Sequence, residues 1–596
     1  MRSLIIFFVL AVSACAAAPE GVAIFESHCA TCHQTETGSR TPTRAELANL
    51  TPEQVMSALL RGKMTVQGAA LSTIEIRAVA LYVTGKNWSA QPVDPAAGRC
   101  SGNPKPFSPG SGDWNGWGVD SSNARYQPRP GFQAADAPRL KLKWAFGFPD
   151  DTQAAGQPVI VSGRVFVGSN GGVVYSLDAS TGCVYWTYDA GGIVRSAINI
   201  VKSSKASSQK SKWIAYFGDY HGSMHAVDAE TGKLLWKVKI DDHPAARITG
   251  SPTYYDGRLY VPMASSEELD GGSPQYECCT FRGSVTSLDA ETGRIIWKTY
   301  SVPDPPKVYK TSTAGTKLYG PAGAGIWSSP TIDAKRKRVY AGTGNSYTGI
   351  GIPTSDSVLA FDLATGSLLW SSQVTPGDNW MGGCPKGPNC PDNPGEDIDF
   401  GSSSILHSLP GGKQILVATQ KSGVIYGLDP DQRGKVLWKT RVGLGGAQGG
   451  VQFGAAVDDH IAYAAVSDLY KRDKGTPGMY AIKIDNGEEL WATPAPSGAG
   501  NPAQLSAVSA MPGLAFSGSW GGHLRAYSTK TGEIVWDFDA GRDFETVNHV
   551  PAQGGSFNGG GPAIANGMVI STCGFGFVGG KPGNVLLAFS VDGESR

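Results

Sequence analysis

"HAVDAETGKLLW", residues 225–236, is one of seven related stretches that recur through most of the chain. Each reads as a strand, a tight turn that contains glycine, and a second short strand that ends in tryptophan. The tryptophans that end these stretches are Trp186, Trp236, Trp297, Trp370, Trp438, Trp491 and Trp536. Trp144, in "LKLKWAF", fits as an earlier member, and neighbouring tryptophans lie 42 to 73 residues apart. A period of this length holds about four short strands, which predicts a β-propeller.

The two ends of the repeat region predict how the ring closes. After Trp536 come the strand-like stretches "AIANGMVIST" and "NVLLAFSVDG", but no further strand that ends in tryptophan. Trp144 has its own strand and nothing strand-like before it. Joining the two ends in one blade gives an all-β eight-bladed propeller with no open sheet edge. The loops of such a ring converge on an axial funnel, the usual place for a ligand.

A small all-α domain is expected before the propeller, over residues 19–90. "CATCH", residues 29–33, is the attachment signature of haem c. A signature of this kind makes Cys29 and Cys32 the thioether sites and His33 an axial ligand of the iron.

The second axial ligand of the iron has two candidates. Small class I cytochromes c, which this region resembles, carry a methionine on a loop before a terminal helix, and that likeness implies Met64. The rival is Met56, inside the helical stretch "TPEQVMSALL", where methionine usually fills a core. The predicted terminal helix places four residues near helical spacing: Ile74, Ala78, Leu81 and Tyr82.

The remaining segments suggest an exported chain. Residues 1–18 resemble a secretory signal, and "VSAC" also resembles a lipoprotein signal, which would leave a lipid anchor at Cys15. Either alternative places the mature protein outside the cytoplasm, in the periplasm, which suits haem attachment and disulfides. Residues 91–112 are dense in Pro and Gly and form the expected linker. The propeller is expected over residues 113–596.

The charge balance argues against a polyanion as partner. The chain has 51 Lys and Arg and 51 Asp and Glu, and no basic run that would form a nucleic-acid-binding patch. Its 79 Gly and 15 Trp favour many short strands joined by tight turns.

The repeated phrase Asp-Ala-x-Thr-Gly-x-x-x-Trp resembles the tryptophan-docking motif of the quinoprotein alcohol dehydrogenases. These are eight-bladed propellers that bind pyrroloquinoline quinone (PQQ) and Ca²⁺, and the likeness runs from Trp114 to the end. The order of the domains, cytochrome first, together with "SSEE" and "ECCTFRG", resembles the cytochrome-containing polyvinyl-alcohol dehydrogenases. A non-catalytic outer-membrane assembly factor shares the repeat, so function has to be argued from the site.

The resemblance implies a calcium site and a catalytic base. Ca²⁺ takes oxygen ligands, and the matching positions are Glu267 or Glu268 in "MASSEEL" and Asn345 in "YAGTGNSY". Asp399 in "EDIDFGSS" matches the family's general base and a further calcium ligand, with Asp397 as its rival.

The resemblance also implies contacts to the quinone. Trp327 in "GAGIWSSP" matches the tryptophan that stacks on the ring, and Lys421 matches the basic residue that hydrogen-bonds the reactive carbonyls. Arg195 and Thr249 match positions that bind the cofactor's carboxylates, and arginine suits a carboxylate through its bidentate fork.

The cysteines raise several pairings. Cys278 and Cys279 could form a vicinal disulfide like the ring that covers the quinone in related enzymes, although those enzymes carry it one blade earlier. Two separate pairings or free thiols stay open as alternatives. For the rest we expect these partners: Cys384 with Cys390, Cys100 with Cys183, and Cys573 left over.

Together these features predict an enzyme that oxidises secondary alcohols with PQQ and Ca²⁺. Its electrons would pass singly to the fused haem c and on to a downstream cytochrome c or respiratory chain. The alternatives are oxidation of another small alcohol, sugar or aldehyde, and a non-catalytic binding propeller tethered to a cytochrome. For a polymer such as polyvinyl alcohol, the long inserts 301–326 and 371–400 are expected to form the walls of an open groove.

Overall fold

The computed structural model describes residues 21–34, 42–61, 64–68, 70–87, 94–102, 104, 106–204, 212–471 and 473–593. The expected leader and Cys15 lie outside these residues. Within them, every helix is too short or too polar to cross a bilayer.

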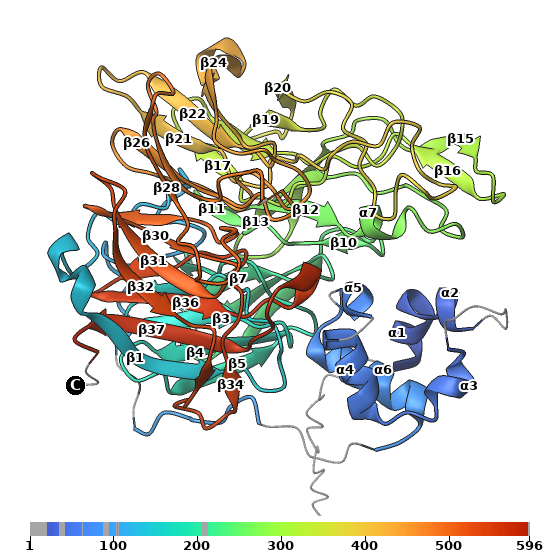
Figure 1. Cartoon of the computed structure of the whole chain (residues 1–596), viewed down its shortest axis with the longest axis horizontal. Coiled ribbons are helices and arrows are strands. Elements are labelled where there is room, and N and C mark those ends of the chain that lie inside the picture. Colours follow the sequence, from blue (N-terminus) through green and yellow to red (C-terminus); the bar gives the residue numbers. More distant parts are fainter. Residues whose placement is uncertain are drawn as a thin grey trace, which may run out of the picture.

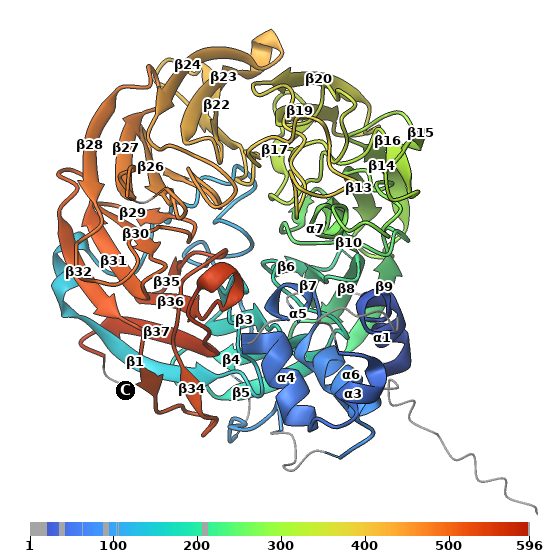
Figure 2. The ribbon, with the colours of Figure 1, turned by 45° about the vertical axis from the view of Figure 1, so that its right-hand side comes forward.

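The chain folds into eight antiparallel blades arranged in a ring, with the helices of the N-terminal part against one side (Figures 1 and 2). This confirms the predicted fold class. The first blades along the ring contain β2 (Val159–Val161), β3 (Arg164–Gly168), β4 (Val173–Asp178) and β5 (Val184–Asp189); β6 (Asn199–Lys202), β7 (Trp213–Gly218), β8 (Ser223–Asp228) and β9 (Leu234–Lys239); and β10 (Ala246–Arg247), β11 (Thr253–Tyr255), β12 (Arg258–Ser265), β13 (Ser284–Asp289) and β14 (Ile295–Tyr300).

Four further blades follow in chain order. They contain β17 (Thr331–Asp333), β18 (Arg338–Gly342), β19 (Ser357–Asp362) and β20 (Leu368–Gln373); β21 (Ile405–Ser408), β22 (Gln414–Thr419), β23 (Val424–Asp429) and β24 (Lys435–Arg441); β25 (Ala456–Val457), β26 (Ile461–Val466), β27 (Gly478–Lys483) and β28 (Glu489–Pro494); and β29 (Ser509–Met511), β30 (Leu514–Gly518), β31 (His523–Ser528) and β32 (Ile534–Asp539).

The eighth blade is built from both ends of the propeller. Its strands are β1 (Leu140–Gly147), β37 (Val585–Val591), β36 (Met568–Cys573) and β35 (Ala563–Ala565). β1 pairs antiparallel with β37, and Trp144 lies opposite Ala588. The predicted shared blade is therefore confirmed. Outside the blades lie two hairpins and three 3₁₀ turns: β15 (Lys307–Thr311) with β16 (Lys317–Gly320), β33 (Asp543–Phe544) with β34 (Ala552–Gln553), η1 (Ala134–Arg139), η2 (Pro430–Gln432) and η3 (Phe577–Gly579).

The repeated phrase locks each blade to its neighbour. In the stretch 228–236, Asp228 accepts the N–H groups of Glu230 and Thr231, which shapes the turn. Gly232 has φ +74° and lies flat on the Trp186 indole, where an added Cβ would come within 2.7 Å of the ring. Only glycine satisfies both conditions without strain.

Most of the docking tryptophans also donate a hydrogen bond across the blade boundary. The bonds run from Nε1 to a backbone oxygen: Trp144 to Ala179, Trp186 to Ala229, Trp236 to Ala290, Trp438 to Ile484, Trp491 to Thr529, and Trp536 to Leu140. The last of these bonds reaches the first strand and closes the ring. Trp297 and Trp370 are buried with Nε1 unbonded in the described structure.

The N-terminal part forms a small helical unit. Its helices are α1 (Gly21–His28), α2 (Ala30–His33), α3 (Arg44–Leu47), α4 (Pro52–Arg61), α5 (Thr65–Gly68) and α6 (Thr73–Thr84). α1 packs closely on α6, since Gly21 lies against the Ala78 carbonyl and the Tyr82 side chain. Ser72 and Glu75 form a capping box that starts α6.

The predicted α6 is present, but its buried face differs from the one expected. The most buried apolar side chains are Ile76, Val79, Ala80 and Val83, one to two positions away from the predicted set. Because the helix packs on the other helices and also on the propeller, it is largely covered all round. Its apolar stripe therefore did not reveal the buried face.

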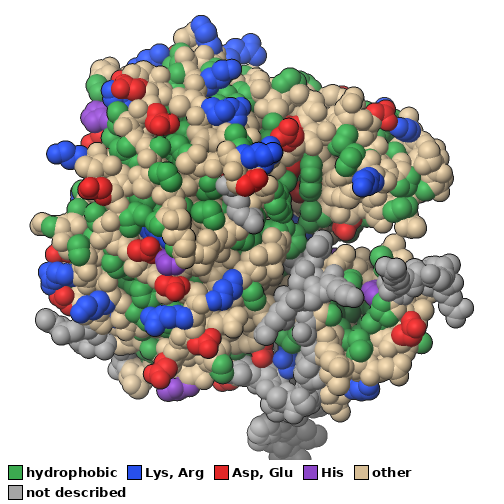
Figure 3. Space-filling model, viewed as in Figure 1, with side chains coloured by type: hydrophobic (Ala, Val, Ile, Leu, Met, Phe, Trp, Pro, Cys, Tyr) green, Lys and Arg blue, Asp and Glu red, His purple; other side chains and the backbone are tan. Residues whose placement is uncertain are grey.

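Three contacts between side chains hold α6 against the propeller. They are Thr73 Oγ1 to Asp151 Oδ1 at 2.5 Å, Glu75 Oε1 to His221 Nε2 at 2.7 Å, and Arg77 Nη1 to Asp150 Oδ2 at 3.3 Å. α5 lies beside η3 on the same side of the ring. The space-filling view shows the surface hollowed between these helices and the rim above them, and acidic and basic side chains are interspersed on this face (Figure 3).

Three disulfides link described cysteines. Cys100 pairs with Cys183, which ties the segment before the propeller to the residue that precedes β5, and Cys384 pairs with Cys390. Cys278 is joined to Cys279, and Cys573 is a buried free thiol. The first two pairings and the unpaired Cys573 confirm the predictions, and the vicinal pair is one of the three alternatives for Cys278 and Cys279.

Candidate active site

A narrow slot lies where loops of several blades meet. Its volume is about 20 Å³, and its lining includes Trp117, Arg195, Thr249, Trp327, Gly401 and Phe453. Arg195 and Thr249 also line a larger cavity of about 200 Å³, which reaches as far as Ala70 of the helical unit. The two spaces therefore connect the propeller's loops with the N-terminal helices.

Trp327 forms one wall of the slot. Its indole lies directly on Gly401, where any Cβ would overlap the ring, and its edge meets Phe453 at 5.7 Å between ring centroids. Trp327 Nε1 donates to Asp399 Oδ2 at 3.2 Å. The expected stacking tryptophan and the expected base are thus in direct contact.

Asp399 is buried and stands at the centre of a polar cluster. Its Oδ1 accepts the backbone N–H of Asn345 at 2.9 Å, and its Oδ2 lies 3.4 Å from Lys421 Nζ. Lys421 also donates to Asp397 Oδ1. Burial alone would lower the pKa of Lys421, but the carboxylates of Asp397 and Asp399 raise it above its ordinary value, so the ammonium stays charged.

Asn345 is positioned to offer an oxygen. Its Nδ2 donates to the carbonyls of Ser346 at 2.7 Å and Trp380 at 2.8 Å. Both bonds use the nitrogen, so they orient the amide and leave Oδ1 without a hydrogen bond within the described residues.

The two adjacent glutamates point to different places. Both belong to α7 (Glu267–Asp270). Burial raises the pKa of Glu268 to about 7; the charge of Asp399 adds to the rise, while the Tyr347 hydroxyl and Lys421 oppose it. The charges of Asp399 and Lys421 both act on the Glu268 carboxylate, which places it near the Asp399 cluster.

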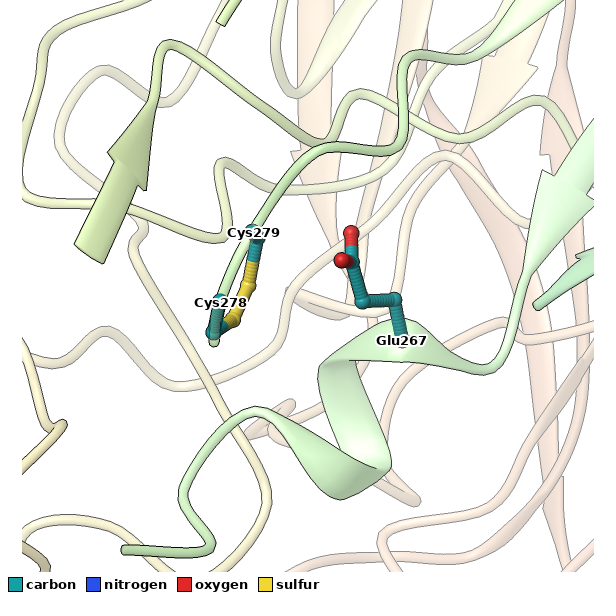
Figure 4. A group of neighbouring side chains, drawn as sticks. All are labelled: Glu267, Cys278 and Cys279. Carbon is teal, nitrogen blue, oxygen red and sulfur yellow. A yellow bond between two sulfur atoms is a disulfide. The ribbon is translucent and has the colours of Figure 1, made fainter. Parts of the chain in front are cut away.

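Glu267 is fully engaged elsewhere. Its carboxylate accepts the N–H groups of Thr280 at 2.9 Å and Phe281 at 2.8 Å. Figure 4 shows it directed toward the Cys278–Cys279 pair. Three such side chains could in principle hold a metal ion, but both sulfurs are committed to the disulfide.

The vicinal cysteines lie beside Glu267 rather than in the slot. Neither Cys278 nor Cys279 is among the residues that line the slot or the larger cavity. Both pack in an apolar cluster with Phe281, Tyr347 and Met381. The structure thus does not bring them to the place where Trp327, Arg195 and Thr249 meet.

Arg195 and Thr249 provide unused polar atoms at the slot. Thr249 Oγ1 is buried and has no hydrogen-bond partner in the described structure. Arg195 contacts the Tyr220 hydroxyl at 3.5 Å and lies 5.2 Å from the Phe453 ring centroid, and it pairs with no carboxylate of the described chain. Both groups are free to bind an anion.

The helical unit contains the features expected of a haem crevice. The His33 ring is buried and its Nδ1 lies 2.6 Å from the Pro42 carbonyl, which leaves Nε2 for the iron. Cys29 and Cys32 are free thiols, and burial raises the pKa of Cys29 to about 11. Met64 and Met56 both pack against the helical core.

The two long inserts meet each other, and the second also carries Asp399, which accepts a hydrogen bond from Trp327 at the wall of the slot. Lys310 in the β15–β16 hairpin pairs with Asp392, and Asn389 donates to the carbonyls of Ser273 and Tyr276 beside the vicinal cysteines. None of the residues lining the two cavities comes from 301–326 or 371–400.

Sequence reasoning missed Trp117, Phe453 and Ala70 as parts of the two cavities. Trp117 falls outside the docking series, and that irregularity was the one available clue. Phe453 and Ala70 stand in unremarkable stretches, and only the folded chain places them there.

Family models match most of the chain. The model described as glucose/ethanol/alcohol dehydrogenase, beta-propeller domain (PQQ), matches residues 114–442. Cytochrome C oxidase, cbb3-type, subunit III matches residues 16–83, and outer membrane protein assembly factor BamB matches residues 421–554.

Individual proteins match as well. A polyvinylalcohol dehydrogenase of a Pseudomonas species is 42% identical over 97% of this chain and 94% of its own length. A second, from Sphingopyxis sp. strain 113P3, is 38% identical over 96% of this chain and 93% of its own. Among solved structures, quinohemoprotein alcohol dehydrogenase ADHIIG of Pseudomonas putida HK5 superposes with a TM-score of 0.62 at 19% identity, covering 82% of this chain and 81% of that one.

Proposed function

Because the chain belongs to the family of PQQ-dependent alcohol dehydrogenases that includes the polyvinylalcohol dehydrogenases, we propose that it oxidises secondary hydroxyl groups of polyvinyl alcohol or its oligomers. The chain is an enzyme of the oxidoreductase class, with a cytochrome domain fused to its catalytic propeller. The observation that carries the catalytic part is the contact of Asp399 with Trp327, Asn345 and Lys421 in one buried cluster. A binding scaffold would have no need of this convergence.

The residues that line the slot have the chemistry that a flat, anionic quinone requires. Trp327 offers an aromatic face, and the unpaired guanidinium of Arg195 and the unbonded Thr249 hydroxyl suit carboxylates. When bound, PQQ supplies a carbonyl carbon that accepts a hydride. Lys421, kept charged by Asp397 and Asp399, would donate a hydrogen bond beside that carbonyl.

The proposed base is Asp399. Its carboxylate would take the hydroxyl proton of the alcohol as the C–H hydride leaves the same carbon, so that a carbonyl product forms. The N–H groups of Trp327 and Asn345 hold the carboxylate in place. A base fixed in this way needs no reorganisation when the proton moves.

We propose Ca²⁺ as the metal, held by Glu268, Asn345 and Asp399. These residues supply only oxygen donors, which Ca²⁺ prefers. A cation there would also offset the repulsion between these neighbouring carboxylates. The raised pKa of Glu268, to which the charge of Asp399 contributes, reflects that repulsion. When bound, such an ion polarises a neighbouring carbonyl as a Lewis acid.

The haem would receive the electrons one at a time. His33 Nε2, the two thiols of the CATCH stretch and Met64 can hold it. The cavity that joins the slot to Ala70 supports a direct route from the propeller to the helical unit. We propose the periplasm as the location and a cytochrome c or respiratory chain as the final acceptor.

The Met64→Ala variant is expected to keep haem covalently attached while its midpoint potential falls. The thioethers and His33 do not depend on Met64, whereas a methionine ligand raises the potential. Reduced-state spectra and a redox titration measure both effects, with Met56→Ala as the matched control. If the spectrum and potential change only in Met56→Ala, Met56 is the ligand.

The polymer proposal is tested by substrate length. After reconstitution with PQQ and Ca²⁺, kcat/KM with a dye acceptor is expected to rise along a series of 1,3-diol oligomers and to exceed the values for ethanol and methanol. Contacts beyond the reacting carbon can be used in the transition state, which is why a longer substrate should gain. Flat or falling kcat/KM with length, alongside good methanol turnover, would leave a small-alcohol dehydrogenase.

A further inference from the structure

Arg247 is a buried cation without an anion. It lies at the end of β10, is 6% exposed, and lines the 200 Å³ cavity. Its guanidinium donates one hydrogen bond, from Nη1 to the Tyr220 carbonyl at 3.0 Å, and its Nε is buried with no partner in the described structure. An arginine has five N–H donors, so most of this group's capacity is unused.

The charges around Arg247 do not neutralise it by contact. Burial lowers its pKa, and Tyr220 and the carboxylates of Glu75, Asp270 and Glu268 act in the opposite direction. None of the three carboxylates forms an ion pair with it in the described part of the chain. Removing a guanidinium from water without a direct partner is costly, so an anion bound in the cavity would stabilise the site.

The cavity that Arg247 faces lies between the two redox parts of the molecule. On one side are Arg195 and Thr249, which also line the quinone slot. On the other is Ala70, which follows the proposed ligand Met64 by six positions. Burial lowers the pKa of His28, the residue before Cys29, and the charge of Arg247 lowers it further, which places Arg247 near the haem attachment stretch.

We propose that Arg247 binds a carboxylate of a resident redox cofactor at this junction. Two sources have the right chemistry: a propionate of the haem and a carboxylate of PQQ. A guanidinium binds either through two parallel N–H···O bonds. The inference rests on the proposed function in assuming both cofactors, and it gives the chain a cationic group at the boundary between them.

The test compares the full-length, haem-loaded protein with Arg247→Met and Arg247→Lys. Two quantities are measured without any alcohol: the haem midpoint potential in quinone-free protein, and the Kd of PQQ by equilibrium dialysis. Arg282→Gln is the matched control. It also removes one positive charge from the same blade, but Arg282 donates hydrogen bonds to the carbonyls of Val302 and Pro303 and does not line the cavity.

For a propionate, Arg247→Met lowers the reduction equilibrium constant up to about tenfold, which is about 59 mV for one electron, with an unchanged PQQ Kd. For a PQQ carboxylate, the Kd rises at least about tenfold and the potential is unchanged. Arg247→Lys, which keeps the charge, should retain most of the potential in the first case and lose affinity in the second. Either pattern supports the proposal and identifies the source.

A thermal melt separates this role from a structural one. If the anion is a carboxylate of PQQ, Arg247→Met should leave the Tm of quinone-free protein unchanged or higher, because an uncompensated buried charge has been removed. If it is a haem propionate, which is already bound in haem-loaded protein, Arg247→Met should lower the Tm and Arg247→Lys should not. A fall in Tm of both variants, or unchanged potential and unchanged PQQ affinity, overturns the proposal. Failure of alcohol oxidation bears on neither measurement, so it would count against the proposed activity alone.

Discussion

We expect Asp399→Asn to lower alcohol oxidation by about 10²–10⁴-fold, the usual contribution of a general base, while PQQ still binds. Asparagine keeps the shape of aspartate, and its one amide oxygen can still accept a hydrogen bond from either Trp327 or the Asn345 N–H, but it cannot take a proton. The loss should therefore appear in kcat rather than in the affinity for PQQ. Steady-state kinetics with a dye acceptor and a PQQ titration measure the two separately.

Asp397→Asn is the matched control for this experiment. Asp397 also contacts Lys421, so its replacement should disturb the position of the lysine and have a smaller effect. If Asp397→Asn abolishes turnover and Asp399→Asn is mild, the base is Asp397 and the roles of the two aspartates are exchanged.

Glu268→Gln should reduce the affinity for Ca²⁺ by at least about 100-fold. Mutation of a residue that only supports a metal ligand already costs about 10–100-fold in affinity, and Glu268 is proposed as a ligand itself. Activity should fall with it and recover at high Ca²⁺, because a neutral amide removes one charge from the site without blocking the slot. Titration of PQQ-reconstituted enzyme with Ca²⁺ after chelation gives the affinity.

Glu267→Gln, one residue away, should behave differently. Its carboxylate accepts the backbone N–H groups of Thr280 and Phe281, and an amide nitrogen turned toward either would leave a buried donor unpaired, at about 1–3 kcal/mol. A lower Tm with unchanged Ca²⁺ affinity is the expected outcome. Loss of Ca²⁺ affinity in this variant and not in Glu268→Gln would assign the ligand to Glu267.

The ring of blades was predictable because its determinants are local and repeated. One short phrase and its neighbour contain the turn at Asp228, the glycine at position 232 and the docked Trp186. Wherever the phrase recurs in the sequence, the same local geometry can therefore be expected. The count of eight and the shared blade of Trp144 then followed from the ends of the series.

The parts that were not predictable depend on contacts between distant segments. Adjacent glutamates differ only in which way α7 turns them, and no local pattern distinguishes Glu267 from Glu268. Likeness alone suggested that the vicinal cysteines cover the quinone, and only the folded chain shows that their segment packs beside Glu267. Arg247 belongs to no motif, and its unpaired state becomes visible only when β10, Tyr220 and Ala70 enclose one cavity.

The blade shared by β1 and β37 has a consequence for how the protein is made. β37 is among the last strands to leave the ribosome, and the slot combines Trp117 with Gly560, which are separated by most of the chain. Neither the closed ring nor a complete quinone pocket can exist in a nascent chain, because such long-range pairings form late. The helical unit depends only on nearby residues and can fold much earlier. Biogenesis is therefore ordered in time: haem can be attached while the propeller is still open, and PQQ must be loaded last. We expect a premature stop codon before β37 to leave a cytochrome domain without a closed propeller.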